Sequence, residues 1–190
     1  MAATYTEQSH WGLGKWIRAR ETEVILQMIG TTTLGDVLEL GSGSGYYTRL
    51  LNNRGCQRLV YVDFSATMLE KIQIPNGIKV EADIQDYIDE QQFDLILCAG
   101  ALEFLERPEA VFHNAAEMLK TNGSLVVLMP TKTIFGLGYQ LYHRLHQIRI
   151  RLFHLNQIQT WVEAVGLTLV KWQSAPLFSL VIKCTKTLKS

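Results

Sequence analysis

The sequence predicts an α/β fold built on a doubly wound, mostly parallel sheet of seven strands, with an antiparallel hairpin at its C-terminal end. Two patterns lead to this fold. From residue 37 onward, apolar runs of strand length alternate with helical segments, as they do in parallel sheets. A glycine-rich turn joins the first strand to the next helix. With 190 residues and 47% hydrophobic residues, the chain can build a substantial core, and residues 1–190 are interpreted as one domain.

The elements follow one another in order. Apolar residues at helical spacing over 14–29, closed by Gly30, predict an N-terminal helix within a cap formed by residues 1–30. The expected strands are 37–40, 59–62, 78–82, 93–98, 124–129, 168–172 and 178–184. The expected later helices are one through Leu51 after the glycine turn, then 65–72, 108–119 and 156–165, the last capped by Asn156. Residues 131–154 are left as an insertion after the fifth strand.

Three alternating glycines mark the end of the first strand. Gly41, Gly43 and Gly45 follow Glu39, and glycine is needed where φ is positive or where the backbone must approach a ligand closely. The helix that follows presents unpaired N–H groups to such a ligand. Tyr46 occupies the position where the dinucleotide fingerprint requires its third glycine, and no Gly-Lys-Ser/Thr follows. The turn is therefore a candidate cradle for another nucleotide-like ligand.

Further polar groups are expected at the same edge of the sheet. Asp63 follows the second strand, about 20 residues after the first glycine, where βαβ units place a carboxylate for ribose hydroxyls. Asp83 follows the third strand, and Cys98–Ala101 follow the fourth. Because ligands of doubly wound sheets bind outside the carboxyl ends of the strands, these residues are expected to converge on one site.

These motifs together resemble the class I S-adenosylmethionine-dependent methyltransferases over about residues 37–184. The resemblance is carried by Glu39-x-Gly-x-Gly-x-Gly45, Asp63, Ala82-Asp83-Ile84 and the run that begins at Phe93-Asp94. It looks closest to the small-molecule branch related to ubiquinone and menaquinone biosynthesis methyltransferases. It implies a Rossmann-like methyltransferase fold and S-adenosyl-L-methionine as the cofactor.

The resemblance also implies roles for the residues around the glycine turn. Glu39 would hold the methionine ammonium, directly or through water. Gly41, Ser42 and Gly43 would bring the backbone close to the methionine and the ribose, and Asp63 would accept the ribose hydroxyls.

The remaining cofactor contacts are implied for the ends of the neighbouring strands. Phe64 would lie against the adenine, Asp83 would accept its amino group, and the Ile84 N–H would meet a ring nitrogen. The backbone facing the sulfonium would come from three residues, Cys98, Ala99 and Gly100.

Methyl transfer from a sulfonium is a direct displacement, so the main task of the protein is to align the donor with the acceptor. Such alignment can lower the activation barrier by roughly 7–11 kcal/mol. A base is needed only if the acceptor must lose a proton. The candidate bases are His143, His146 and Glu103. No metal site is expected, because the histidines and cysteines lack ligand spacing.

The acceptor side is expected to combine the N-terminal helix, the loop after Cys98 and the 131–154 insertion. Candidate substrate residues are Trp11, Trp16, Phe135, Tyr139 and Tyr142. The insertion also holds Lys132, Arg144, Arg149 and Arg151 and contains no acidic residue. Three interpretations remain open: a cap over a hydrophobic or anionic small molecule, an amphipathic helix resting on a membrane surface, and a helix packed on the sheet with a solvated basic face.

Several features of the sequence bear on functions other than small-molecule methylation. A formal net charge of zero and Cys98-Ala-Gly-Ala101 in place of an Asn/Asp-Pro-Pro-Tyr motif disfavour a nucleic-acid substrate. The paired-glutamate loop of protein arginine methyltransferases is missing. A catalytically silent cofactor-binding subunit and a dehydrogenase stay as alternatives. The sequence predicts neither the acceptor atom nor the oligomeric state.

The cysteines and the N-terminal residues indicate in which cellular compartment the protein is expected. Cys56, Cys98 and Cys184 are odd in number and far apart, which favours thiols in a reducing cytoplasm. Residues 1–7 lack a cationic region followed by an apolar core, so no signal peptide is expected. A cytoplasmic protein is therefore predicted.

Overall fold

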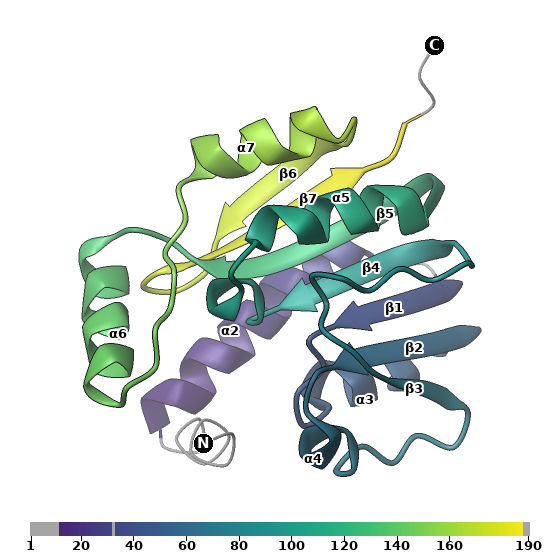
Figure 1. Ribbon diagram of the computed structural model, residues 1–190, viewed down its shortest axis with the longest axis horizontal. Helices are drawn as coiled ribbons and strands as arrows, with labels where there is room; N and C mark the ends of the chain where they lie inside the picture. The colour runs from purple at the N-terminus through teal and green to yellow at the C-terminus, as the bar shows by residue number, and fades with distance from the viewer. Residues whose placement is uncertain (1–11, 32, 188–190) are drawn as a thin grey trace.

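A computed structural model describes residues 12–31 and 33–187 of the chain (Figure 1). One seven-stranded sheet runs in the order β3-β2-β1-β4-β5-β7-β6. The strands are β1 Asp36–Leu40, β2 Arg58–Asp63, β3 Gly77–Glu81, β4 Phe93–Ala99, β5 Leu119–Pro130, β6 Thr168–Ser174 and β7 Ser179–Thr185. The helices are α2 Gly12–Ile29, α3 Tyr46–Asn53, α4 Ala66–Leu69, η1 Leu102–Phe104, α5 Pro108–Met118, α6 Ile134–Leu145 and α7 Leu155–Ala164.

The sheet is mixed in the way the sequence predicts. The strands from β3 to β5 pair in parallel, and β7 pairs antiparallel with both β5 and β6. β1 lies between β2 and β4, with Leu40 opposite both Val62 and Cys98. The chain order reverses beside β1, so the carboxyl ends of β1, β2 and β4 meet at the switch point where ligands of such sheets bind. The predicted fold, including the C-terminal hairpin, is confirmed.

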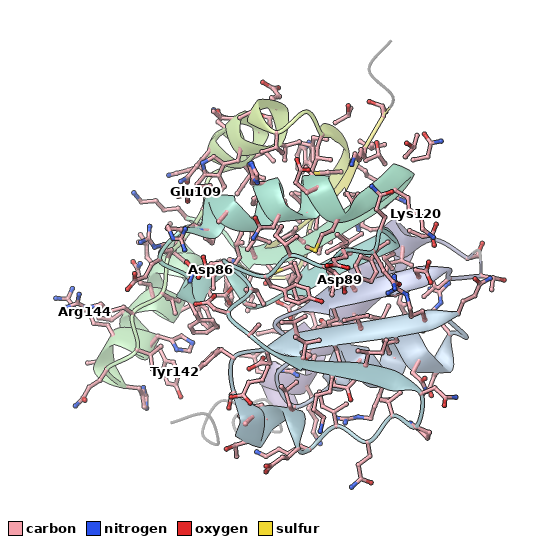
Figure 2. All side chains as sticks on the ribbon, turned by 45° about the vertical axis from the view of Figure 1, so that its right-hand side comes forward. Asp86, Asp89, Glu109, Lys120, Tyr142 and Arg144 are labelled. Atoms are coloured by element: carbon pink, nitrogen blue, oxygen red, sulfur yellow. The ribbon has the colours of Figure 1, made fainter. Side chains whose placement is uncertain are left out.

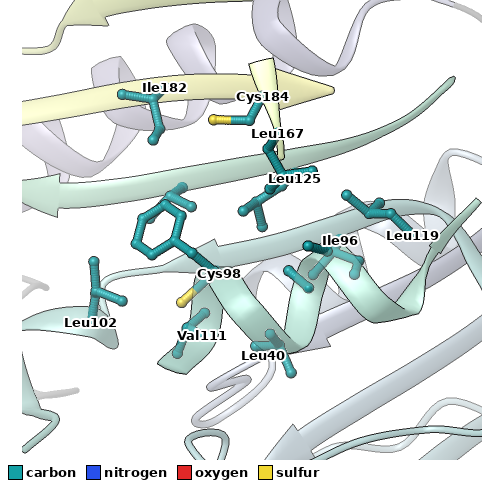
Figure 3. Close-up of a cluster of buried hydrophobic side chains, with 14 of the residues drawn as sticks. Leu40, Ile96, Cys98, Leu102, Val111, Leu119, Leu125, Leu167, Ile182 and Cys184 are labelled. Carbon is teal, nitrogen blue, oxygen red and sulfur yellow. The ribbon is translucent and has the colours of Figure 1, made fainter. Parts of the chain in front are cut away.

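Helices cover both faces of this sheet (Figure 1). Leu38 and Leu40 of β1 belong to a buried cluster with side chains of α5 and α7, part of which is shown in Figure 3. Val37 belongs to a second buried cluster with side chains of α2 and α3. Because successive strand residues point to opposite faces, a strand covered on both sides is apolar throughout, and this explains the nearly continuous apolar run of β4.

Three of the differences from the expected element boundaries have a clear physical reason. β5 begins at Leu119 rather than at residue 124, because Leu119 already pairs with Phe93 and the intervening residues form an irregularity in the register. α4 ends at Leu69 rather than at residue 72, because the Ile72 N–H bonds to the Leu69 carbonyl in a three-residue turn. α7 begins at Leu155 with His154 at the N-cap, so the expectation that Asn156 caps this helix is wrong.

The segment between β5 and α7 lies beyond the end of the sheet. Figure 1 shows α6 on the side to which β1, β4 and β5 point, with the N-terminal end of α2 on the same side. The Thr133 side chain caps α6 by accepting from the Gly136 N–H at 3.1 Å. Among residues 12–31 and 33–187, no helix combines the length and the apolar character needed to cross a membrane.

Candidate functional site

The glycine turn closes tightly over the end of β2. The N–H groups of Gly41 and Ser42 both donate to the Val62 carbonyl, at 2.9 and 3.0 Å. Gly41, Gly43 and Gly45 all have positive φ, which only glycine adopts without strain. A Cβ on Gly41 would lie 2.4 Å from the Ala101 Cβ, whereas a Cβ on Gly43 would meet nothing within 4 Å. The turn therefore packs against the end of β4 at Gly41 and borders open space at Gly43.

Asp63 ties the second strand to this turn. Its Oδ2 accepts from the Gly43 N–H at 2.7 Å, and its Oδ1 accepts from the Ser65 N–H at 3.0 Å. The side chain is buried, so the two bonds hold the carboxylate in one orientation at the carboxyl end of β2. Each carboxylate oxygen still has acceptor capacity for another donor.

Glu39 is a buried acid one strand away. It is 2% exposed, and within the described part of the chain its Oε2 has no hydrogen-bond partner. Burial raises the pKa of Glu39 to about 8, and the nearby Asp63 carboxylate adds to the effect. The Ser42 hydroxyl is also buried and, among these residues, unpaired. A buried acceptor without a donor is costly, so Glu39 is built to receive a cation or a donor from a ligand.

The groups expected around the adenine lie on the far side of the turn. Ile84 is buried and comes within 3.8 Å of the position that a Gly41 Cβ would take. Phe64 is 77% exposed, immediately after Asp63. The Asp83 carboxylate is exposed and accepts from the backbone N–H of Gln85 at 2.9 Å. All three lie at the carboxyl ends of β2 and β3, as expected from the sequence.

The end of β4 joins this turn to a second cavity. Cys98 is buried between β1 and β5, and burial raises the pKa of its thiol. Ala99 follows, and Gly100 has a φ of 68° with its N–H bonded to the Leu128 carbonyl at 3.1 Å. Gly100 also lines a cavity of about 380 Å³.

This second cavity, here called the acceptor pocket, is mostly apolar and aromatic. It is enclosed by α2, the end of β5, α6 and the start of β7. Its lining includes Leu13, Ile17, Arg18 and Glu21 of α2, Glu103 of η1, Tyr139, Tyr142 and His143 of α6, and Phe178 and Ser179 before and on β7. Tyr139 stacks on Phe178 with ring centroids 4.4 Å apart. The pocket therefore has a flat aromatic wall facing a few polar groups.

Two acids in the acceptor pocket are held in an apolar setting. Glu103 is 3% exposed, and no described residue bonds its Oε2. Burial raises the pKa of Glu103 to about 8, with a further contribution from the charge of Glu21. Burial also raises the pKa of Glu21, whose Oε1 accepts a short hydrogen bond from the Ser179 hydroxyl. Glu103 is thus mostly protonated at pH 7 and releases its proton near pH 8, at the lining of the cavity.

The histidines expected from the sequence separate in the structure. His143 is buried and lines the acceptor pocket, with its ring edge-to-face against Tyr139 at 4.4 Å between centroids. Burial lowers the pKa of His143, and the neighbouring His146 adds to the effect, so the imidazole is neutral at pH 7. His146 is exposed, outside the pocket lining, with its Nδ1 2.8 Å from the Tyr142 carbonyl. The structure brings Glu103 and His143 together and leaves His146 outside.

The expected substrate residues divide in the same way. Tyr139 and Tyr142 line the acceptor pocket. Trp16 and Phe135 do not line it and are exposed. Phe135 shares the helix face of Tyr139 and Tyr142 but lies one turn before Tyr139, outside the cavity lining. Trp11 lies outside the residues that the structure describes.

Sequence reasoning missed Arg18, Glu21, Phe178 and Ser179. Glu21 had a detectable signal, since it continues the i, i+4 line of Leu13 and Ile17 toward the buried Ile25 and thus places an acid within an apolar stripe. Phe178 and Ser179 had no such signal, because only the return of β7 beside β5 brings them to the cavity. Among the described residues, no group of three or more His, Cys, Asp and Glu side chains is arranged to hold a metal ion.

Comparison with known proteins shows which proteins the chain resembles. Residues 38–127 match the family described as "Methyltransferase domain". Trans-aconitate 2-methyltransferase of Enterobacter sp. (strain 638) is 34% identical over 116 residues, which cover 60% of this chain and 46% of the relative. The chain thus spans about half the length of the curated relatives it matches.

Solved structures share the fold. Magnesium protoporphyrin IX methyltransferase from Synechocystis, solved with bound S-adenosylhomocysteine, aligns with a TM-score of 0.76 and 14% identity over 96% of this chain and 93% of that one. The N-methyltransferase NodS from Bradyrhizobium japonicum, also with S-adenosylhomocysteine, aligns with a TM-score of 0.67 and 21% identity over 87% of each chain.

Proposed function

We propose that this chain, whose residues 38–127 form a class I S-adenosylmethionine-dependent methyltransferase domain, transfers a methyl group to a small molecule held in the acceptor pocket. The observation that carries the proposal is Glu103, a buried acid whose Oε2 has no partner among the described residues and which lines the pocket beside Gly100. Gly100 belongs both to the pocket and to the strand end next to the glycine turn.

The residues around the glycine turn fit S-adenosylmethionine. Glu39 offers a buried, unpaired acceptor (among the described residues) that suits the methionine ammonium. Asp63 retains acceptor capacity for the ribose hydroxyls, and the open space at Gly43 lets a ligand approach the backbone. Phe64, Asp83 and Ile84 are proposed to hold the adenine, and the backbone from Cys98 to Gly100 is proposed to face the reacting end. The bound cofactor supplies a methyl group already activated on a sulfonium.

The chain's own contribution is to position and deprotonate the acceptor. The aromatic wall of Tyr139 and Phe178 orients a flat or apolar body, and exclusion of water strengthens the polar contacts inside the pocket. Glu103 accepts a proton from the acceptor atom as that atom attacks the methyl group. His143, neutral at pH 7, lines the same pocket and is a second group able to hold that proton.

A small-molecule acceptor is favoured by the size and lining of the acceptor pocket. A cavity of about 380 Å³ falls at the low end of small-molecule sites. The relatives named above are described as acting on small molecules, trans-aconitate and magnesium protoporphyrin IX. Arg18 is the cation that the described lining provides, so an acceptor with one anionic group and an apolar body fits best.

The same proposal assigns a role to each part of the chain. Residues 1–190 are proposed to act as one methyltransferase domain, in which residues 131–154 and the described residues of 1–30 form the cap over the acceptor. Residues 1–11 of this predicted cap lie outside the described part of the chain. Cys56, Cys98 and Cys184 are free thiols, which supports a reducing compartment such as the cytoplasm.

To test this proposal, a cell extract is divided by ultrafiltration into a small-molecule and a macromolecular fraction. The purified protein is then incubated with each fraction and with S-adenosylmethionine labelled on its methyl group. We expect label in an organic-extractable product of the small-molecule fraction. Label confined to the macromolecular fraction would instead assign a nucleic-acid or protein acceptor.

Calorimetry with S-adenosylhomocysteine and with NAD accompanies the assay. Cofactor binding without turnover on any fraction would identify a silent subunit, and binding of NAD alone would identify a dehydrogenase.

A further inference from the structure

One face of α6 carries a row of large apolar side chains that touch no other part of the described core. Ile134, Leu137, Leu141 and Leu145 are spaced three and four residues apart, so they form a single stripe along the helix. Ile134 is 86% exposed and Leu145 is 75% exposed. Phe135, which is 61% exposed, adds a further apolar side chain at the start of the same helix. Contiguous exposed apolar surface of this kind marks an interaction site.

The packing of α6 holds this stripe outward. The opposite side of the helix carries Gly136, which is buried, and Tyr139 and His143, which line the acceptor pocket. A Cβ on Gly136 would lie 2.1 Å from the Thr131 carbonyl oxygen, so the start of α6 runs against the preceding chain. Turning the helix to bury the stripe would remove His143 and Tyr139 from the pocket, and the exposed face is therefore a stable feature of the fold.

Positive charge surrounds the stripe. Residues 131–154 contain no acidic residue, and Lys132, Arg144, Arg149 and Arg151 are all exposed. Figure 2 shows Arg144 at the outer edge of the molecule with Tyr142 on the same helix, far across the view from Lys120. An apolar helix face flanked by arginine and lysine is the arrangement that binds in the plane of an anionic lipid surface.

The mouth of the acceptor pocket borders α6, the helix that carries the stripe. Leu13 of α2 and Tyr142 of α6 both line the pocket and are both exposed, so its opening lies between these two helices. Lys15 and Trp16, exposed on the same end of α2, add a cation and an amphipathic ring of the kind found at membrane interfaces.

We propose that Ile134, Leu137, Leu141 and Leu145, with the basic residues beside them, dock the protein on an anionic lipid surface with the pocket mouth facing the lipid. Basic charge is the feature that selects lipid headgroups over a second copy of this chain, whose α6 would carry the same charge. The proposal stands apart from the proposed methyl transfer, because docking needs neither cofactor nor acceptor.

The experiment is co-sedimentation of the full chain with sucrose-loaded vesicles, made of phosphatidylcholine alone or with phosphatidylglycerol. We expect the wild type to pellet with the anionic vesicles, less so at high salt. Leu137→Gln/Leu141→Gln should lower the partition coefficient by about tenfold or more on anionic vesicles. Arg144→Gln/Arg149→Gln should lower it by about fivefold for each charge removed, on anionic vesicles only.

The matched control is Ile78→Gln/Ile88→Gln, which removes two similarly exposed apolar residues on and after the edge strand β3 and should bind like the wild type. Circular dichroism and binding of S-adenosylhomocysteine verify that each variant is folded. A wild type that stays in the supernatant, or a Leu137→Gln/Leu141→Gln variant that binds as the wild type does, would overturn the proposal. A wild-type dimer that this variant disperses, without vesicle binding, would assign the face to a second copy and overturn it as well.

Discussion

The Gly43 N–H and the Asp63 carboxylate are joined by a hydrogen bond of 2.7 Å between the end of β2 and the turn after β1. The other oxygen of Asp63 accepts from Ser65 at 3.0 Å. One buried side chain thus fixes the turn that we propose as the cofactor cradle, while it retains acceptor capacity for a ligand.

Asp63→Ala should weaken binding of S-adenosylhomocysteine. The substitution removes a charged acceptor for the ribose and releases the Gly43 N–H, and hydrogen bonds to charged groups contribute about 1.5–3 kcal/mol each. The dissociation constant measured by calorimetry should therefore rise by about tenfold to 100-fold. Glu90→Ala, at an exposed acid in the loop before β4, is the control and should bind as the wild type does. Equal affinities for the wild type and Asp63→Ala would remove Asp63 from the cofactor site.

Gly41→Ala should mainly lower stability, whereas Gly43→Ala should mainly weaken cofactor binding. Both place alanine at positive φ, which costs about 1–2 kcal/mol. Only Gly41→Ala also forces a Cβ to within 2.4 Å of the Ala101 Cβ, so it should lose more stability in chemical denaturation. Gly43→Ala has room for its Cβ and should keep most of its stability, but the new methyl group enters the space proposed for the cofactor. Its main loss should be in affinity for S-adenosylhomocysteine, and the reverse ranking would contradict the geometry.

The stability of the cofactor-free protein should fall as the pH rises toward 8. Glu39 and Glu103 have pKa values of about 8 in the folded protein and an ordinary value of 4.5. Between these values the folded state keeps protons that the unfolded state has released, so the free energy of unfolding decreases with pH and levels off above about 8.

Urea denaturation from about pH 5 to about pH 8 measures this slope. The double variant Glu39→Gln/Glu103→Gln should show a flatter dependence, because the two neutral amides do not titrate. Parallel curves for the wild type and the variant would show that neither acid is held protonated by burial.

Glu103→Gln should reduce turnover while leaving cofactor binding intact. An amide cannot accept the proton, and loss of a general base lowers kcat by about 100-fold or more. In the free wild-type enzyme, kcat/KM should rise with pH toward about 8, as Glu103 loses its proton, and the variant should lack this rise. Glu106→Gln, at an exposed acid three residues along the chain, is the matched control. An unchanged pH profile in Glu103→Gln would move the role of base to another group, with His143 the next to test.

Much of the cofactor half of the site follows from local patterns. Each of the signals for this half spans only a short stretch of chain. They are the glycines at positive φ, an acid at or near the end of each of the first three strands, and the period of the apolar residues. These patterns predict the sheet, its hairpin and the meeting of Gly41, Asp63 and Gly100 at one edge, because parallel strands must bring their carboxyl ends together. The boundaries of β5 and α4 depended instead on pairing and turn geometry that propensity does not encode.

The sequence by itself therefore determined the fold class and predicted the cofactor and the turn proposed to hold it, since these depend on interactions between residues close in the chain or in one βαβ unit. Only the tertiary structure decided the acceptor side. Glu21 and Glu103 share one cavity because α2 packs beside β5 and β7, and Phe178 reaches Tyr139 because β7 returns antiparallel along β5. Helix rotation separated His143 from His146 and turned the apolar stripe of α6 outward, and such rotation is set by long-range packing that a linear pattern does not contain.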